Sequence, residues 1–244
     1  MSLFVIADLH LSTAEQTNKS MEVFGRRWSD YVARLVHNWR AVVNDEDTVI
    51  IPGDVSWALT LDEAISDFTL LHSLPGRKIL GKGNHDFWWS TASKLTAFTK
   101  EHAFQNIFFL FNNAFETDEF LLAGTRGWYQ DESCENLPKD TDFKKLVARE
   151  ASRLDTSLKA AKALKKENDR REILAFLHFP PIWNGLVCEE IVDVLKKHGI
   201  SRCFFGHIHG NYTAPASFLH DGIAFSLISA DFLEFYPRLI QPND

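Results

Sequence analysis

The chain has 244 residues, of which 45% are hydrophobic and 20 are phenylalanine, and its formal net charge is -7. This length and apolar content predict a single globular domain over residues 1–244 and exclude a disordered chain. The acidic balance disfavours nucleic-acid backbones as the main partner, because proteins that bind them usually carry a basic excess. The sequence also contains no motif specific to nucleic-acid binding.

The cysteines and the N-terminal segment indicate a cytoplasmic protein. Cys134, Cys188 and Cys203 are odd in number and lack the CxxC spacing of zinc or redox sites, which is typical of reduced thiols. Residues 1–8 lack a basic segment, so no signal peptide is predicted. No apolar run reaches the length of a membrane span, and the oligomeric state stays open.

The first apolar run covers residues 3–7 and is typical of a strand buried on both faces. It ends in Asp8-Leu9-His10. Residues i and i+2 of an extended segment point to the same side, so Asp8 and His10 can share one metal ion. The alternative is a strand end with two solvated polar residues.

Apolar residues at helical spacing predict an amphipathic helix over residues 20–43. The second apolar run, 48–51, ends in Pro52-Gly53-Asp54. The glycine allows a sharp turn, which would bring the Asp54 carboxylate to the end of the strand. Thr60-Leu61-Asp62-Glu63 then fits a capping box that opens a helix ending near Leu74.

The third strand end is the most polar, because an apolar run stops on Asn84-His85-Asp86. All three side chains need hydrogen-bond partners if they are buried. Asn84 offers a neutral oxygen ligand, His85 a proton donor, and Asp86 an acceptor able to orient the imidazole. For this stretch alone, a polar turn explains the sequence equally well.

The rest of the chain continues the alternation of helices and strands. We expect helices at residues 90–101, with Ser90 as the cap, and at 141–170 and 186–198. Strands are expected at residues 107–111, 120–123, 172–177, 202–205, 212–214, 223–228 and 232–236. Two of these strands, 172–177 and 202–205, again end on histidines, namely His178, His207 and His209.

The polar strand ends suggest one common site. Alternating strands and helices predict a largely parallel sheet, whose carboxyl ends meet at one edge. The polar side chains at this edge are Asp8, His10, Asp54, Asn84, His85, His178, His207 and His209. Such ligands suit manganese, iron or zinc at two adjacent ions and disfavour an iron–sulfur cluster. Asp54 has enough lone pairs to bridge both ions, and a bridging hydroxide would be the natural nucleophile for phosphorus.

The ordered set Asp8-x-His10, Gly53-Asp54, Gly83-Asn84-His85-Asp86, His178 and Gly206-His207-x-His209 resembles the calcineurin-like metallophosphoesterase superfamily, the dimetal phosphoesterases. The resemblance runs from residue 5 to about residue 210. It implies an α/β fold that forms a four-layer α/β/β/α sandwich with two mixed β-sheets.

The same resemblance assigns roles to individual residues. It implies that one ion is held by Asp8, His10, Asp54 and His209. The other ion would be held by Asp54, Asn84, His178 and His207. His85 would act as the general acid or as a phosphate contact, oriented by Asp86.

The expected activity is hydrolysis of a small phosphomonoester or phosphodiester with two divalent cations, Mn2+ and/or iron first and Zn2+ second. The Gly53-Asp54 motif continues as Val55-Ser56-Trp57 and lacks the Asp-Arg pair of Ser/Thr protein phosphatases, which argues against a phosphoprotein substrate. Alternatives are a nucleotide-specific phosphodiesterase, a nucleoside-diphosphate-lipid pyrophosphatase, or a non-catalytic scaffold of the same fold.

Substrate contacts are expected from residues near the strand ends. Trp57, Trp128 and Trp183 are candidates for the cleft rim, where they would favour an aromatic or nucleoside leaving group; core packing is the alternative. Arg126 lies between two glycines and could clamp a phosphate oxygen, or else form an ion pair. The irregular segment 129–140 is expected to cover the cleft.

Overall fold

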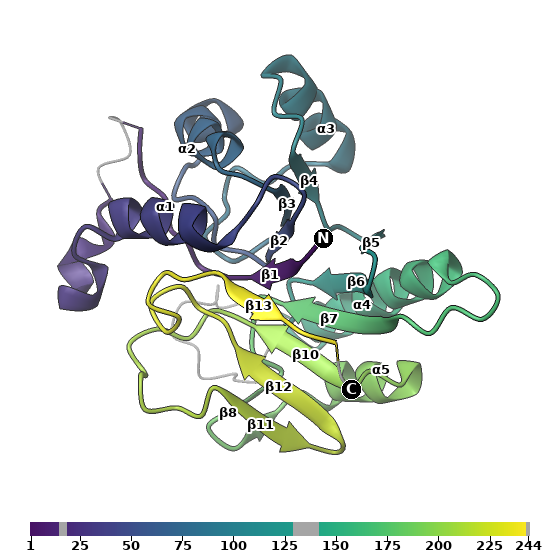
Figure 1. Cartoon of the computed structure of the whole chain (residues 1–244). Coiled ribbons are helices and arrows are strands. Elements are labelled where there is room, and N and C mark those ends of the chain that lie inside the picture. The colour runs from purple at the N-terminus through teal and green to yellow at the C-terminus, as the bar shows by residue number, and fades with distance from the viewer. Residues whose placement is uncertain (15–18, 129–141, 243–244) are drawn as a thin grey trace.

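The computed structural model describes residues 1–14, 19–128 and 142–242. Two β-sheets lie face to face, and helices lie beside each of them (Figure 1). The first sheet has the strand order β13-β1-β2-β3-β4. Its strands are β1 (Leu3–Val5), β2 (Thr48–Ile51), β3 (Arg77–Leu80), β4 (Ile107–Phe109) and β13 (Arg238–Ile240). Strands β1 to β4 run parallel, and β13 is antiparallel to β1.

The second sheet has the order β11-β12-β10-β7-β6-β5. Its strands are β5 (Ala114–Glu116), β6 (Phe120–Thr125), β7 (Glu172–Leu177), β10 (Arg202–Phe205), β11 (Ser217–His220) and β12 (Ile223–Leu227). The four central strands are parallel, and β5 and β11 close the edges in the antiparallel direction. A small hairpin of β8 (Ile182–Trp183) and β9 (Leu186–Val187) follows β7.

Helices cover the outer faces of both sheets. α1 (Tyr31–Val42), α2 (Leu61–Ser73) and α3 (Ala92–Glu101) lie on the side of the first sheet, whereas α4 (Phe143–Leu164) and α5 (Glu189–His198) lie on the side of the second (Figure 1). Thr60 caps α2 by accepting a hydrogen bond from the amide of Glu63, as the predicted capping box requires. Gly199 ends α5 in the left-handed conformation.

Three apolar layers explain why the strands are continuous apolar runs. Phe4 and Ile6 pack with the helices beside the first sheet, whereas their neighbours Leu3 and Val5 face the second sheet. A separate cluster lies between the second sheet and α4 and α5. Helices, sheet, sheet and helices therefore form four layers, and the predicted α/β/β/α sandwich with two mixed sheets is confirmed. A single domain over residues 1–244 stays a prediction.

Several helices differ from their predicted limits. The helix predicted over residues 186–198 begins only at Glu189, because Leu186–Val187 forms β9 of the hairpin. The segment 20–43 forms two short 3-10 helices, Met21–Phe24 and Arg26–Trp28, before α1 begins at Tyr31. Gly25, with φ of 109°, separates them because this conformation cannot continue a helix. α4 ends at Leu164, ahead of the polar residues 165–170. The cap of α3 is Thr91, one residue beyond the predicted Ser90.

Two predicted closing strands are absent from the described part of the chain. Residues 212–214 form a loop, and β11 begins only at Ser217. Residues 232–236 form a turn in which Glu234 and Phe235 have φ of 54° and 64°, values that a strand does not allow. The apolar pattern of this turn arises because Phe235 is buried against the helix layer.

Within the described residues, no helix is long and apolar enough to cross a membrane. Cys188 and Cys203 are buried free thiols, as expected for reduced cysteines. Cys134 lies outside the described residues.

Candidate metal centre

The predicted ligands lie along the seam where the two sheets meet. β1, β2 and β3 of the first sheet lead to Asp8, Asp54 and Asn84, and β7 and β10 of the second lead to His178 and His207. The seam is closed by the backbone, because the amide of Ala7 donates to Ile228 at 2.8 Å and Ala7 accepts from the amide of Ala230 at 2.8 Å. The carboxyl ends of both sheets therefore point into the same space.

Four of the predicted ligands have an unusual backbone conformation. Asp8, His10, Asp54 and His207 have φ of 59°, 46°, 51° and 70°. A non-glycine residue in such a conformation costs about 1–3 kcal/mol and persists where its surroundings enforce it. Here the amide of Asp8 donates to Gly53 at 3.0 Å and the amide of His10 donates to Asp54 at 2.9 Å. Asp8 and His10 thus converge through left-handed turns, and the extended geometry expected from their spacing is wrong.

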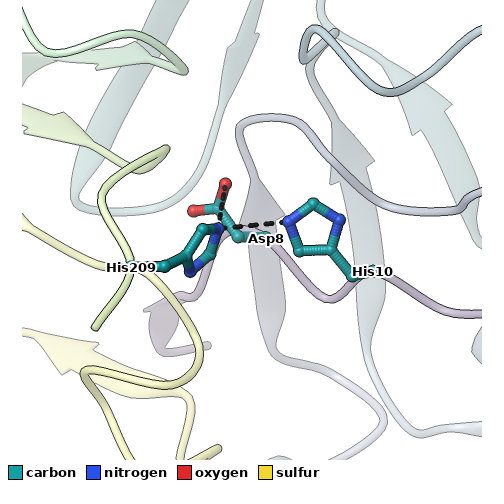
Figure 2. Close-up of side chains that lie close together, drawn as sticks. All are labelled: Asp8, His10 and His209. Atoms are coloured by element: carbon teal, nitrogen blue, oxygen red, sulfur yellow. Dashed lines mark hydrogen bonds and ion pairs between the residues drawn. The ribbon is translucent and has the colours of Figure 1, made fainter. Parts of the chain in front are cut away.

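The first candidate metal cluster contains Asp8, His10 and His209, whose possible ligand atoms lie within 4.8 Å of one another. Figure 2 shows the two imidazoles on either side of the Asp8 carboxylate. Nε2 of His10 is 3.1 Å from Nε2 of His209, and the latter atom is 3.7 Å from Oδ1 of Asp8. Three donors of the kind that manganese, iron and zinc accept therefore face a common point.

The second candidate cluster contains Asp54, His178 and His207, again with ligand atoms within 4.8 Å of one another. Asn84 joins it, since its Oδ1 is 2.7 Å from Nε2 of His178 and 3.1 Å from Nδ1 of His207. The side chains of Asp54 and His178 are almost fully buried. The predicted grouping of ligands in two sets of neighbours is thus present in the geometry.

Asp54 lies between the two clusters. Its Oδ2 is 3.7 Å from Nε2 of His10 in the first cluster and 3.5 Å from Nε2 of His178 in the second. Its Oδ1 accepts the backbone amide of His85 at 2.8 Å, which fixes the carboxylate in place. A single carboxylate oxygen therefore faces a histidine of each cluster, as a bridging ligand would.

The protonation of the cluster fits metal binding. Burial lowers the pKa of His10 and of His178 well below the ordinary range, so both imidazoles are neutral and keep a free lone pair. Burial raises the pKa of Asp8 to about 6, and burial together with the nearby carboxyls of Asp86 and Asp8 raises the pKa of Asp54 well above its ordinary value. The neutral imidazoles of His10 and His178 supply no positive charge to the buried carboxyls beside them, and divalent cations would supply it.

An unpaired nitrogen atom supports the same conclusion. Nδ1 of His178 is buried and has no hydrogen-bond partner among the described residues, and it lies 3.6 Å from Oδ1 of Asp8 in the first cluster. Such atoms are rare in folded proteins unless a ligand or an ion satisfies the group. The donor set, its neutrality and its burial therefore fit two divalent metal ions.

Two glycines allow the carboxylates to approach the strand ends. A Cβ atom on Gly83 would overlap the Asp54 carboxylate, and one on Gly206 would overlap the Asp8 carboxylate. Any larger residue would push the carboxylate away from its cluster. The glycines in the two motifs are therefore required by contact, in addition to any turn that they form.

The structure gives Asp86 a different role from the predicted one. Its carboxylate accepts the amides of Gly83, Asp54 and Val55 at 2.7 to 2.9 Å, and that of Ser56 at 3.3 Å. Burial raises the pKa of Asp86 to about 6, while these amides favour the anion and limit the rise. Asp86 thus joins the loops after β2 and β3, and the expected orientation of His85 by this carboxylate is wrong.

His85 lies half-buried at the edge of the clusters. Its ring centroid is 4.3 Å from that of Trp57 and 5.6 Å from that of His10. Burial, together with the positive charges of His209 and Lys19, lowers the pKa of His85 to about 4. The neutral imidazole is therefore held beside the candidate metal ligands by Trp57, where an incoming phosphate could reach it.

A carboxylate that we did not predict supports His209. Oδ1 of Asp231 is 2.8 Å from Nδ1 of His209, and its other oxygen accepts from the amide of Gly210 at 3.0 Å and the hydroxyl of Tyr212 at 3.1 Å. Burial opposes the charged imidazole, but the Asp231 hydrogen bond and the charge of Asp8 prevail and raise the pKa of His209. Carboxylates in this position orient metal-bound histidines. Asp231 follows an apolar run, so the pattern used for the other ligands also marks it.

Aromatic residues from the helix layer complete the support. Trp28 is buried and packs edge-on against His10 and His209, with ring centroids 6.0 and 5.6 Å apart. The Tyr31 hydroxyl donates to the backbone carbonyl of His10 at 2.7 Å. Neither residue follows a strand end, so the sequence held no signal for this role.

The candidate substrate contacts divide into two groups. Trp57 is stacked on His10 at 5.0 Å, and Trp128 packs on Phe179, whose ring is 4.5 Å from His207. Trp183 packs on Phe205 in the second sheet and, in the part of the chain that the structure describes, has no ring contact with a predicted ligand. The segment 129–140 lies outside the described residues.

Arg126 forms the ion pair that was one of its two predicted possibilities, and the phosphate clamp stays a prediction. Its guanidinium lies 4.7 Å over the ring of Trp128 and 3.7 Å from the Glu150 carboxylate. Its backbone carbonyl accepts the amide of His178 at 3.0 Å, which places the residue beside the second cluster. Arg126 therefore forms the expected ion pair without leaving the neighbourhood of the ligands.

Comparison with known proteins decides the family. A family model described as calcineurin-like phosphoesterase matches residues 1–211. The chain belongs to the calcineurin-like phosphoesterase family. The match includes the predicted metal ligands from Asp8 to His209, whereas Asp231 lies beyond it. A comparison with curated proteins gave no match.

Several solved structures resemble the chain over almost its whole length. Phosphopantetheinyl hydrolase from Mycobacterium tuberculosis is similar at 16% identity and a TM-score of 0.52, covering 99% of this chain and 96% of its own. TT1561 of Thermus thermophilus is similar at 14% identity and a TM-score of 0.55, and the match covers 94% of this chain and 89% of TT1561. AQ665 from Aquifex aeolicus, a protein of unknown function, is similar at 15% identity and a TM-score of 0.50, and the match covers 98% of this chain and 95% of AQ665. At these identities the likeness establishes the fold alone.

Family membership and the two clusters together support a phosphoester hydrolase with a dinuclear metal centre. The family also suggests small phosphoesters as substrates. The recognition made from the strand-end motifs is therefore confirmed.

The raised carboxyl pKa values predict that the metal-free protein becomes less stable to unfolding as the pH rises from 4 to 7.5. Folded Asp8 holds its proton up to about pH 6, against an ordinary value of 3.8, so this carboxyl contributes stability below pH 4 that is lost as the pH rises through 6. The contribution is about 3 kcal/mol for a shift of this size. Thermal unfolding of chelated protein between pH 4 and 7.5 measures it, with Asp8→Asn as the comparison.

In the variant this contribution is absent, so the Tm of the wild type should fall relative to the Tm of Asp8→Asn as the pH rises from 4 to 7.5. Added Mn2+ should reverse the trend in the wild type, because ions compete with protons for the carboxylate. A pH-independent difference between the two chelated proteins would contradict the prediction.

Proposed function

We propose that this calcineurin-like phosphoesterase hydrolyses a small phosphomonoester or phosphodiester at the seam between its two sheets. The observation that carries the proposal is the position of Asp54, whose Oδ2 faces His10 on one side and His178 on the other. No packing role requires one buried carboxylate to face the neutral imidazoles of both His10 and His178. The cofactors would be two divalent cations, Mn2+ and/or iron first, with Zn2+ as an alternative.

The ligands divide between two ions as the family resemblance implies. One ion would be held by Asp8, His10, Asp54 and His209, and the other by Asp54, Asn84, His178 and His207. When bound, the pair would supply positive charge for the phosphate and a water of lowered pKa as nucleophile. Asp231 and Trp28 would hold the His209 imidazole so that Nε2 faces the first ion.

His85 would contact the substrate directly. Its imidazole is neutral near pH 7 and can donate an N–H to a phosphate oxygen. A bound phosphate would raise the pKa of this imidazole, which would let it protonate the leaving oxygen. Asp86 would act as a positioning residue, since it ties together the loops that carry Asp54 and Asn84.

The arrangement argues against a non-catalytic scaffold. A scaffold has no need to retain metal ligands, whereas in this chain all seven predicted ligands and His85 lie together at one seam. The buried free thiols of Cys188 and Cys203 agree with the cytoplasmic location that we propose. Nucleotide-specific hydrolysis and pyrophosphatase activity stay as alternatives within the same reaction class.

A metal-dependent assay tests the proposed function. The purified protein is stripped with a chelator, reloaded with Mn2+, and incubated with bis(4-nitrophenyl) phosphate and 4-nitrophenyl phosphate. Turnover that depends on the metal supports the proposal. A folded sample with two ions bound and no turnover of either ester from pH 5 to 9 would favour the scaffold.

A panel of phosphoesters then narrows the substrate. It should include cyclic nucleotides, nucleoside-diphosphate lipids and phosphopantetheine esters, the last because one similar structure is named a phosphopantetheinyl hydrolase. The ester with the highest kcat/KM identifies the substrate class.

The aromatic rim is tested with aryl esters. We expect Trp57→Ala and Trp128→Ala each to raise KM for an aryl phosphodiester by about 2- to 10-fold, because stacking contributes about 0.5–1.5 kcal/mol. Trp183→Ala should have a smaller effect, since this ring packs on Phe205. Steady-state kinetics with an alkyl phosphodiester is the control. A KM for the aryl phosphodiester that stays at the wild-type value in all three variants would reject the proposed rim.

A further inference from the structure

A basic cavity lies beside the second metal cluster. Its volume is about 490 Å³, and its walls come from the loop after β3, the start of α3, the end of β6 and the first half of α4. Among the described residues that line it, four are basic and one is acidic. They are Lys82, Arg126, Arg149, Arg153 and Glu150. The whole chain carries a net charge of -7, so a cavity with a formal charge of +3 is a local exception.

The single acid does not neutralise the cavity. One oxygen of Glu150 is 2.6 Å from Arg153 and 3.7 Å from Arg126, and the other accepts from the hydroxyl of Thr125 at 2.7 Å. Neither Lys82 nor Arg149 has a carboxylate within ion-pair distance among the residues that the structure describes. Among the described residues no acid neutralises these two cations, so both could bind an external anion.

The backbone adds to the attraction. The start of α3 lines the cavity with Thr91 and Ala92. The first turn of a helix carries partial positive charge and free amides, which favour anions. An anion in the cavity would thus be held by side chains and by the helix end together.

Two walls of the cavity continue directly into the metal cluster. Lys82 is followed by Gly83 and the candidate ligand Asn84, and Arg126 accepts the amide of the candidate ligand His178 at 3.0 Å. The cavity is much larger than one phosphate group, and Trp89, Leu110 and Phe111 supply apolar wall. A ligand that fills it would combine negative charge with an organic body.

We propose that the cavity binds a second phosphate group of the substrate. The substrate would then be an organic molecule with two phosphate groups. The ester bond of one would be hydrolysed at the metal centre, while the other would be held by Lys82, Arg149 and the start of α3. This inference rests on the proposed function for its substrate, but the anion site itself does not depend on catalysis. A second phosphate site would make the enzyme prefer a substrate with two phosphate groups over simple monoesters such as 4-nitrophenyl phosphate.

The test uses inorganic pyrophosphate as the probe and the full-length chain freed of metal, so that binding at the metal centre does not contribute. Titration calorimetry at low salt should show binding to the wild type. Arg149→Glu should abolish it, and Lys82→Gln combined with Arg149→Gln should weaken it by about tenfold or more. Lys162→Gln removes the same charge from an exposed position further along α4 and should leave binding unchanged.

The metal-loaded enzyme gives the second readout. Lys162→Gln should keep kcat for bis(4-nitrophenyl) phosphate within about twofold of wild type, whereas Arg149→Gln should lose more kcat/KM for an ester with two phosphate groups than for this ester, which carries a single phosphate. Absence of pyrophosphate binding to the wild type, or binding that survives Arg149→Glu, would overturn the second phosphate site. Absence of turnover by the loaded wild type would contradict the proposed function and leave the binding result standing.

Discussion

Asp54→Asn is expected to lower turnover of a phosphodiester by about a thousandfold or more, because the substitution removes the charge that both ions would share. The carboxylate oxygen Oδ2 lies 3.7 Å from His10 and 3.5 Å from His178. Asparagine keeps the shape, but it replaces one oxygen with an NH2 group that cannot bind a cation. The metal content should fall from two ions per chain to one or fewer.

The measurement is metal analysis of gel-filtered protein together with steady-state kinetics. Asp221→Asn is the matched control, because Asp221 is an exposed carboxylate that pairs with Lys196 on the surface at 2.7 Å. The control should keep both ions and full activity. Two tightly bound ions in Asp54→Asn, with turnover near that of the wild type, would refute the shared ligand.

His85→Gln is expected to lower kcat by about 10²- to 10⁴-fold, the range for loss of a general acid. In contrast to Asp54→Asn, it should leave the metal content unchanged, since the contact of His85 with Asp54 is made by its backbone amide. His37→Gln removes an exposed histidine from α1 and serves as the control. A variant that binds two ions and keeps the wild-type kcat would remove His85 from the catalytic machinery.

The leaving group separates two roles for His85. If the imidazole protonates the leaving oxygen, kcat of His85→Gln should fall much further for an alkyl ester than for a nitrophenyl ester, whose leaving group needs no proton. If it only contacts a phosphate oxygen, both esters should lose similar amounts. Parallel kinetics with the two esters decides between these roles.

Most of the candidate ligand set could be predicted from sequence because each candidate ligand follows a strand that is apolar on both faces. Asp54, Asn84 and His178 are the clearest cases, since a run of buried residues cannot end on such side chains without partners. A parallel sheet then brings the strand ends together. The two-sheet sandwich itself came from the family resemblance, because alternation of strands and helices alone predicts only one largely parallel sheet.

The conformation of the site could not be predicted in the same way. Asp8 and His10 have left-handed backbones because their amides bond to Gly53 and Asp54 in a neighbouring loop. Asp86 binds amides of residues about thirty positions earlier in the chain. Such contacts depend on the relative placement of two loops, which no local pattern encodes.

Supporting residues divide in the same manner. Asp231 follows an apolar run and was open to prediction, but unlike Asp8 and Asn84 it has no histidine within two positions to strengthen the signal. Trp28 and Tyr31 lie among the apolar residues of the segment 20–43, where amphipathic periodicity explains them without reference to the site. Their contacts with His10 arise only when this segment packs over the sheet seam.

The distribution of the ligands between the two sheets has a mechanical consequence. Asp8, Asp54 and Asn84 extend from the first sheet, whereas His178 and His207 extend from the second. Bound cations would therefore cross-link the two sheets of the sandwich. Anything that lets these sheets slide past one another would also dismantle the centre. Metal supply in the cell would then govern how long the folded chain survives, as well as how fast it turns over substrate.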